Sequence, residues 1–102
     1  MKDILESIIS KVNNTQKANQ YRNDVAIFLQ KDGYSVIKEV KVPNRGDGRK
    51  GKIDIVAEIN NEKTAIEIDW ISPRKKSLFK LENFECNNRI VILRQSKTVI
   101  VL

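Results

Sequence analysis

Two segments with strand-like residue patterns flank the dipeptide Asn60-Asn61, and they restrict the fold of this chain more than any other feature. Apolar side chains occupy every second position of residues 52–59, and residues 63–70 form a second, more apolar segment. Asparagine pairs are suited to the two-residue loop of a β-hairpin. The sequence therefore predicts an antiparallel hairpin. Counting back from its loop places Asp54 opposite Glu67.

The remaining elements follow from apolar periodicity. Helical spacing predicts helices over residues 3–12, 15–33 and 73–85. Shorter alternating or apolar runs predict strands over residues 34–42, 52–59, 63–70, 89–93 and 98–102. Thr15 and Ser72 are the expected N-caps of the second and third helices, and Gly33 the expected end of the second.

The resulting order is α-α-β-β-β-α-β-β. A helix between two strands of one sheet predicts a crossover connection, so we expect an α/β fold with a mixed central sheet flanked by helices. We find no linker or repeat, and residues 1–102 are expected to form a single domain.

The composition excludes several kinds of chemistry. The chain has no histidine and a single cysteine, Cys86. Histidine-based zinc sites, Ser-His-Asp and Cys-His catalysis and an internal disulfide are therefore excluded. No apolar run could span a membrane or act as a signal peptide, which predicts a cytoplasmic protein with no membrane partner. The net charge of +6 suits a polyanionic partner such as nucleic acid, although a lysine-rich surface kept for solubility would give the same charge.

Three carboxylates are expected on one face of the hairpin. Side chains alternate along a strand, so Asp69 shares a face with Glu67, opposite Asp54. Like charges this close repel one another unless a cation lies between them, and Mg²⁺ or Mn²⁺ prefers oxygen ligands. Isolated acidic residues on a solvated sheet face are common. However, Glu67 and Asp69 lie within an otherwise apolar strand, where carboxylates are rare. This position favours a metal site.

The sequence resembles a known nuclease core. The segments that carry the resemblance are residues 51–56 (GKIDIV), 65–69 (AIEID), 72–81 (SPRKKSLFKL) and 89–93 (RIVIL). They look like the core of the PD-(D/E)XK, or restriction-endonuclease-like, superfamily, in which a G-[KR]-[IL]-D strand pairs with a strand bearing E-x-K. The resemblance covers about residues 15–95, and it rests on the order and spacing of the motifs together.

The resemblance implies a Mg²⁺-dependent endonuclease that hydrolyses phosphodiester bonds in DNA, with Mn²⁺ as a substitute metal. Asp54, Glu67 and the backbone carbonyl of Ile68 would hold the metal. A junction- or repair-type nuclease of this size would be structure-selective. It would also be a homodimer, since cutting both strands requires two sites.

This sequence departs from the family pattern at the lysine. Asp69 occupies that position, where it could bind a second metal or enlarge the first site. In this superfamily the neighbouring helix can supply the lysine, and Lys76 and Lys80 lie on one helical face. We prefer Lys80 as the catalytic lysine. For both lysines, a solvated or phosphate-contacting side chain is at least as good an interpretation. The departure also leaves open a catalytically inactive DNA-binding module, or a basic structural protein with an incidental acidic cluster.

Several other residues are expected near DNA or near the site. The cationic residues expected to contact phosphates are Arg45, Arg49, Lys50, Lys52, Arg74, Lys75 and Lys76. Asp24 and Glu39 are candidate accessory acids of the metal site. Trp70 could stack on a base, but we expect it to pack under the third helix instead.

Overall fold

The hairpin predicted around Asn60-Asn61 is present in the structure, a computed structural model that describes residues 1–44 and 46–102. Both asparagines have positive φ, 52° and 64°, as a type I′ loop requires. The register runs from Ile59↔Glu62 to Ile55↔Ile66, as counted from a two-residue loop. The sequence prediction of this hairpin is confirmed.

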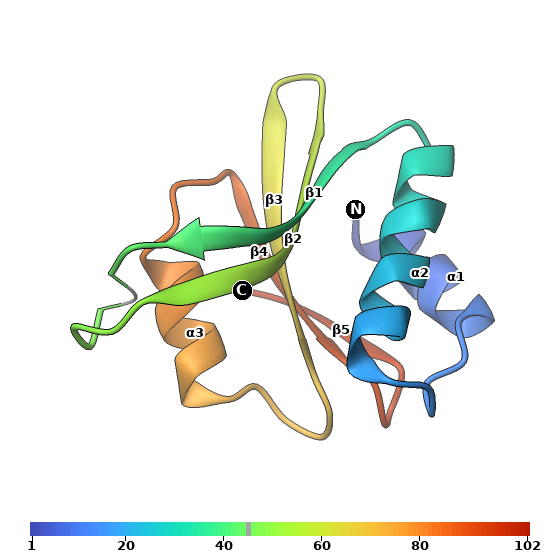
Figure 1. Cartoon of the computed structure of the whole chain (residues 1–102). Helices are drawn as coiled ribbons and strands as arrows, with labels where there is room; N and C mark the ends of the chain where they lie inside the picture. Colours follow the sequence, from blue (N-terminus) through green and yellow to red (C-terminus); the bar gives the residue numbers. More distant parts are fainter. Residues whose placement is uncertain (45) are drawn as a thin grey trace.

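Across the described residues, three helices and five strands follow one another in the predicted order (Figure 1). Their bounds are α1 Lys2–Lys11, α2 Ala18–Lys31, β1 Ser35–Val42, β2 Gly51–Ile59, β3 Glu62–Asp69, α3 Lys75–Glu82, β4 Asn88–Leu93 and β5 Thr98–Val101. The strands form one sheet in the order β1-β2-β3-β4-β5. β3 and β4, joined through α3, are parallel, and the other neighbours are antiparallel. The predicted α/β fold with a mixed sheet is confirmed.

Helices cover both faces of the sheet, α1 and α2 on one side and α3 on the other (Figure 1). Successive side chains of a strand point to opposite faces, so β4 supplies both layers. Ile90 and Ile92 pack with α1 and α2, while Val91 and Leu93 pack in the layer that contains Leu81 of α3. A strand covered on both faces reads as a continuous apolar run, which is the pattern of residues 89–93.

The predicted starts of the second and third helices are wrong by a few residues. Thr15 does not cap α2, because its backbone N–H and its hydroxyl both donate to Oδ1 of Asn13, at 3.0 and 2.8 Å. The helix begins at Ala18 instead. Ser72 does not cap α3, whose N-cap is Arg74. The predicted end of α2 is confirmed: Gly33 has a φ of 98° and donates its N–H to the carbonyl of Gln30. No helix in the described part of the chain is long and apolar enough to cross a membrane.

Candidate functional site

The pairing of β2 with β3 stops at Asp54 and Glu67. The register ends at Ile55↔Ile66, although β3 continues to Asp69 and stays paired with β4 along that stretch. The two carboxylates bond to the backbone where the ladder opens. The N–H of Asp54 donates to Oε2 of Glu67, and the N–H of Ile68 donates to Oδ2 of Asp54, both at 2.8 Å. Each acid is thus fixed by the opposite strand, and the predicted proximity of Asp54 and Glu67 is confirmed.

A lysine from α3 reaches this pair of acids. Lys80 forms an ion pair with Glu67, and its ammonium group also donates to the carbonyl of Lys52 at 2.9 Å. Both side chains are buried, with residue exposures of 8 % for Lys80 and 0 % for Glu67. Lys76, the other candidate, is exposed to solvent. The packing of α3 therefore places Lys80 beside the acids, while its role in catalysis stays a prediction.

The ionisation of Glu67 is strongly perturbed. Its pKa is raised from 4.5 to about 7, first by burial and then by the negative charge of Asp54, while the hydrogen bond and charge of Lys80 act in the opposite direction. Desolvation is the dominant cause, because a buried carboxylate loses its hydration. A divalent cation between Asp54 and Glu67 would favour the ionised form.

Asp69 has a different set of partners. Its Oδ2 accepts the backbone N–H of Arg74 at 3.0 Å, and its Oδ1 accepts Nε of Arg74 at 2.6 Å and the hydroxyl of Ser77 at 3.0 Å. Asp69 thus accepts hydrogen bonds from residues at the start of α3, where Ser72 was the predicted N-cap. Within residues 1–44 and 46–102, no group of three or more acidic, histidine or cysteine side chains could hold a metal. A metal-binding role for Asp69 stays a prediction.

Replacing Asp69 tests these two roles against each other. We expect Asp69→Asn to lower the free energy of unfolding by about 2 kcal/mol, because one of its three hydrogen bonds comes from the guanidinium of Arg74 and another, from Ser77, is buried. Ser77→Ala, which removes one neutral donor, should cost about 1 kcal/mol. Urea unfolding measures both. Unchanged stability of Asp69→Asn, with weakened binding of Mn²⁺, would instead identify Asp69 as a ligand.

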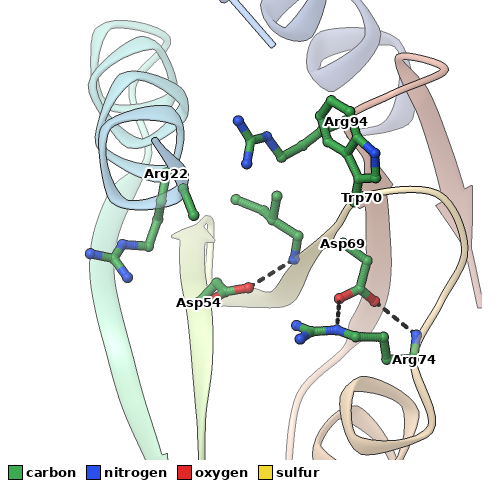
Figure 2. A pocket seen from close by; sticks show the side chains of 8 residues that line it. Arg22, Asp54, Asp69, Trp70, Arg74 and Arg94 are labelled. Atoms are coloured by element: carbon green, nitrogen blue, oxygen red, sulfur yellow. Dashed lines mark hydrogen bonds and ion pairs between the residues drawn. The ribbon is translucent and has the colours of Figure 1, made fainter. Parts of the chain in front are cut away.

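A pocket of about 240 Å³ opens beside Asp54 (Figure 2). Its walls come from α2, from β2, from the ends of β3 and β4, and from the start of α3. The lining residues are Ala18, Arg22, Asp54, Ile68, Asp69, Trp70, Arg74 and Arg94. Arg74 extends toward Asp54 from the start of α3, and Arg94 lies beside Trp70 at the other end of the pocket (Figure 2). The expectation for Trp70 is wrong: it is 47 % exposed and lies 5.3 Å from the guanidinium of Arg94, instead of being packed under α3. The sequence reasoning did not single out Arg22 or Arg94, since neither belongs to a local motif.

The predicted DNA-contacting cations lie on two segments. Arg49, Lys50 and Lys52 lead into or begin β2 and are exposed. Lys75 and Lys76 are exposed in the first turn of α3. Two predicted DNA-contacting residues remain. Arg74 is half-exposed and forms an ion pair with Asp69, and Arg45 lies outside the described residues.

The two candidate accessory acids make contacts of their own. Asp24 accepts a hydrogen bond from the amide of Gln16 at 2.9 Å and does not line the pocket. Glu39 lies between the pairs Lys38↔Ile55 and Val40↔Ile53, which is the position opposite Asp54. Its φ of 55° interrupts β1 there, and its carboxylate pairs with Arg22 at 3.3 Å. Glu39 therefore contacts the pocket only indirectly, by its ion pair with Arg22, which is one of the lining residues.

Comparisons with known proteins support the fold. No protein-family model and no curated protein matches this chain. A solved structure that it resembles is that of a protein of unknown function, AF1548, with a TM-score of 0.59 and 18 % sequence identity. The match covers 76 % of this chain and 47 % of the other, so this chain spans about half the length of that protein. At this level of identity the likeness shows a shared fold.

Proposed function

We propose that this protein is a divalent-metal-dependent nuclease of the PD-(D/E)XK type that hydrolyses phosphodiester bonds in DNA. The observation that carries the proposal is the group formed by Asp54, Glu67 and Lys80. Two acids are fixed where the β2–β3 ladder opens, and an ammonium group from α3 is held against one of them. Buried ionisable groups with a perturbed pKa beside a pocket are typical of functional sites.

The two acids suit a hard cation. Mg²⁺ is usually bound through one or two carboxylates, with water and substrate phosphate as the remaining ligands. Oδ1 of Asp54 accepts no hydrogen bond from any residue that the structure describes, and Asp54 lines the pocket. Asp54 and Glu67 would hold the ion, with the carbonyl of Ile68 as the third ligand that the family resemblance implies. When bound, the metal would polarise a phosphate and lower the pKa of an attacking water.

The remaining residues supply charge and position. Lys80 is buried, so its positive charge acts in a medium that screens it weakly and can stabilise negative charge developing on a phosphate. The exposed cations at Arg49, Lys50 and Lys52 suit contacts to the phosphate backbone. Cleavage of a duplex requires two such sites, so we propose that the active form is a homodimer.

Cleavage assays test the proposal. We expect plasmid and branched DNA to be cut in Mg²⁺ or Mn²⁺ but not in EDTA. Asp54→Asn and Glu67→Gln should each lower the rate by about a thousandfold, because several kcal/mol of charge stabilisation is lost with the metal. Glu58→Gln removes an exposed carboxylate from the same strand as Asp54 and is the matched control, expected to cut at the wild-type rate. Metal-independent cutting, or full activity in Asp54→Asn, would contradict the proposal.

A non-catalytic DNA-binding module is the second candidate. The observation that favours it is the ion pair of Lys80 with Glu67, which already neutralises one of the two acids, together with the engagement of Asp69 by α3. DNA binding without cleavage in either metal would establish this alternative. Failure to bind DNA at low salt would exclude both functions.

A further inference from the structure

The helix α3 has a second apolar side besides the one that packs on the sheet. Its buried residues are Ser77, Lys80 and Leu81. Leu78 and Phe79 lie on the outer side of the helix, and Leu78 is 37 % exposed. A helix that packs only on its own sheet is normally polar over its remaining surface. In the described part of the chain, α3 is the only helix on its face of the sheet (Figure 1), so this second apolar side has no partner there.

Leu78 and Phe79 line an open groove of about 430 Å³. Leu102, which follows β5, lines the same groove and is 56 % exposed. Single exposed apolar side chains are common on protein surfaces, whereas these three are grouped in one place. Apolar side chains at the centre of a surface, with charged residues around them, are typical of a protein-binding site. The groove is therefore a candidate docking surface.

Arg89 fixes the shape of this groove, of which it is a lining residue. Its Nε donates to the carbonyl of Leu81 at 2.6 Å, and its Nη2 donates to that of Phe84 at 2.9 Å. Both carbonyls belong to the C-terminal end of α3, where a cation is favourable and where backbone carbonyls lack partners within the helix. Arg89 thus ties β4 to α3, and its guanidinium is engaged by α3 itself. An ordered groove loses little entropy when a partner binds.

The two remaining charges of the groove lie at opposite ends of α3. Lys75 is the first residue of the helix and Glu82 the last, and neither has an ion-pair partner among the described residues. They are about two helical turns apart, so both lie on the same side as Leu78 and Phe79. A helix favours anions at its N-terminus and cations at its C-terminus. Within a single chain, both charges are therefore at the unfavourable end.

An antiparallel copy of α3 reverses this arrangement. Lys75 then lies beside the partner's Glu82, and the two-fold axis repeats this contact at the other end of the helix pair. Each cation lies near the C-terminus of the opposite helix and each acid near its N-terminus, where the helix dipole favours them. Leu78 and Phe79 meet at the centre and are removed from water. A partner of uniform charge would match one end of the groove and repel the other. The groove is thus complementary to a second copy of itself.

We propose that α3 forms a two-fold symmetric dimer interface, with Leu78 and Phe79 at its centre and an ion pair between Lys75 and the partner's Glu82 at each end. The inference rests on the proposed function only for the need of two active sites, and it adds the surface that joins them. Lys75, one of the predicted phosphate contacts, is thereby assigned to the interface. Lys76 lies on a different side of α3 and is not part of it. Because the contact is short, we expect a Kd of about 10 µM.

Charge reversal tests the pairing of Lys75 with the partner's Glu82. Sedimentation velocity at about 0.1 M salt, without DNA or metal, measures the dimer Kd. Lys75→Glu and Glu82→Lys each place like charges at both ends of the interface, so each should raise the Kd about a hundredfold. An equimolar mixture of these two variants restores both ion pairs, and a heterodimer should form with about the wild-type Kd. The double variant Lys75→Glu/Glu82→Lys should also dimerise like the wild type.

Two further variants separate the apolar contact from a general effect of charge. Leu78→Asp places a carboxylate at the desolvated centre of the interface and should raise the Kd about a hundredfold. Glu6→Lys makes the same charge reversal as Glu82→Lys at an exposed position of α1, and should change the Kd by less than about twofold. Circular dichroism should show the helix content of the wild type in every variant, so that a lost dimer is not mistaken for an unfolded chain.

A wild-type protein that stays monomeric at about 1 mM would overturn the inference and leave the groove to a different partner. So would a Lys75→Glu or Leu78→Asp variant that dimerises as the wild type does, or a mixture of the two charge-reversed variants that stays monomeric. These measurements contain no DNA and do not depend on cleavage. A dimer that never cuts DNA would refute the nuclease function and leave this interface standing. Metal-dependent cutting by a monomeric protein would refute the interface alone.

Discussion

Lys80→Met is expected to lower the rate of DNA cleavage at saturating DNA by about a thousandfold, because preorganised positive charge at a reacting phosphate is worth several kcal/mol. Methionine keeps the length and much of the volume of the lysine stem, so the packing of α3 on the sheet should survive. Lys76→Met, four residues earlier on α3, removes an exposed lysine. It should raise KM through a lost phosphate contact and leave kcat within about threefold of the wild type.

The Lys80→Met variant also leaves Glu67 buried without its counter-ion. Loss of one partner of a buried pair is destabilising, by about 3 kcal/mol where the remaining charge stays ionised. The double variant Lys80→Met/Glu67→Gln removes both charges and should recover most of this stability without recovering activity. The two readouts therefore separate a catalytic lysine from a structural one. A Lys80→Met protein that cuts at the wild-type rate would assign Lys80 to structure alone.

The pairing of Asp54 with Glu67 could be predicted because it depends on short-range information. A two-residue loop at Asn60-Asn61 fixes the register, and a register error of one residue would turn the apolar face of the strand to solvent. Counting along the strands then gives the neighbours across the hairpin. The opening of the ladder at this point could not be predicted, because it depends on bonds between each carboxylate and the opposite backbone.

The starts of α2 and α3 were mispredicted because several residues compete to satisfy a helix terminus at similar energy. Capping by one side chain is worth about 1 kcal/mol, so a single tertiary contact decides the outcome. Asn13 engages Thr15, and Asp69 reaches Arg74 and Ser77 from the end of β3. Helical spacing likewise placed Lys76 and Lys80 on one face, and only the packing of α3 buries Lys80.

Part of the pocket beside Asp54 could not be predicted from the sequence. Arg22, Trp70 and Arg94 come from α2, the end of β3 and the end of β4, and no local motif connects them. Only the folded chain places the three together. No spacing between residues that are close in the sequence indicates that these three side chains meet in the folded protein.

The stability of the metal-free protein is expected to fall as the pH rises from about 4.5 to 7. The folded state raises the pKa of Glu67 to about 7, so in this window it binds a proton that the unfolded chain releases. The stabilisation is complete below the ordinary pKa and is lost as the pH rises through the folded value. Its full size is about 3 kcal/mol, from a shift of some 2.5 pH units at about 1.4 kcal/mol each. Urea unfolding in EDTA at a series of pH values measures it.

Glu67→Gln should flatten this dependence, because the amide resembles the protonated acid and cannot ionise. The stability of the variant in EDTA should therefore stay level between pH 4.5 and about 7, where that of the wild type falls, while Glu58→Gln, at an exposed position on β2, should keep the wild-type slope. Added Mg²⁺ or Mn²⁺ should stabilise the wild type above pH 7 and leave Glu67→Gln unchanged, since a ligand stabilises only the state that binds it. An acid kept only for its ion pair with Lys80 would show no stabilisation by metal. A metal ligand is expected to behave in this way: its buried carboxylate destabilises the metal-free fold near neutral pH, and binding of a cation restores the stability of the protein.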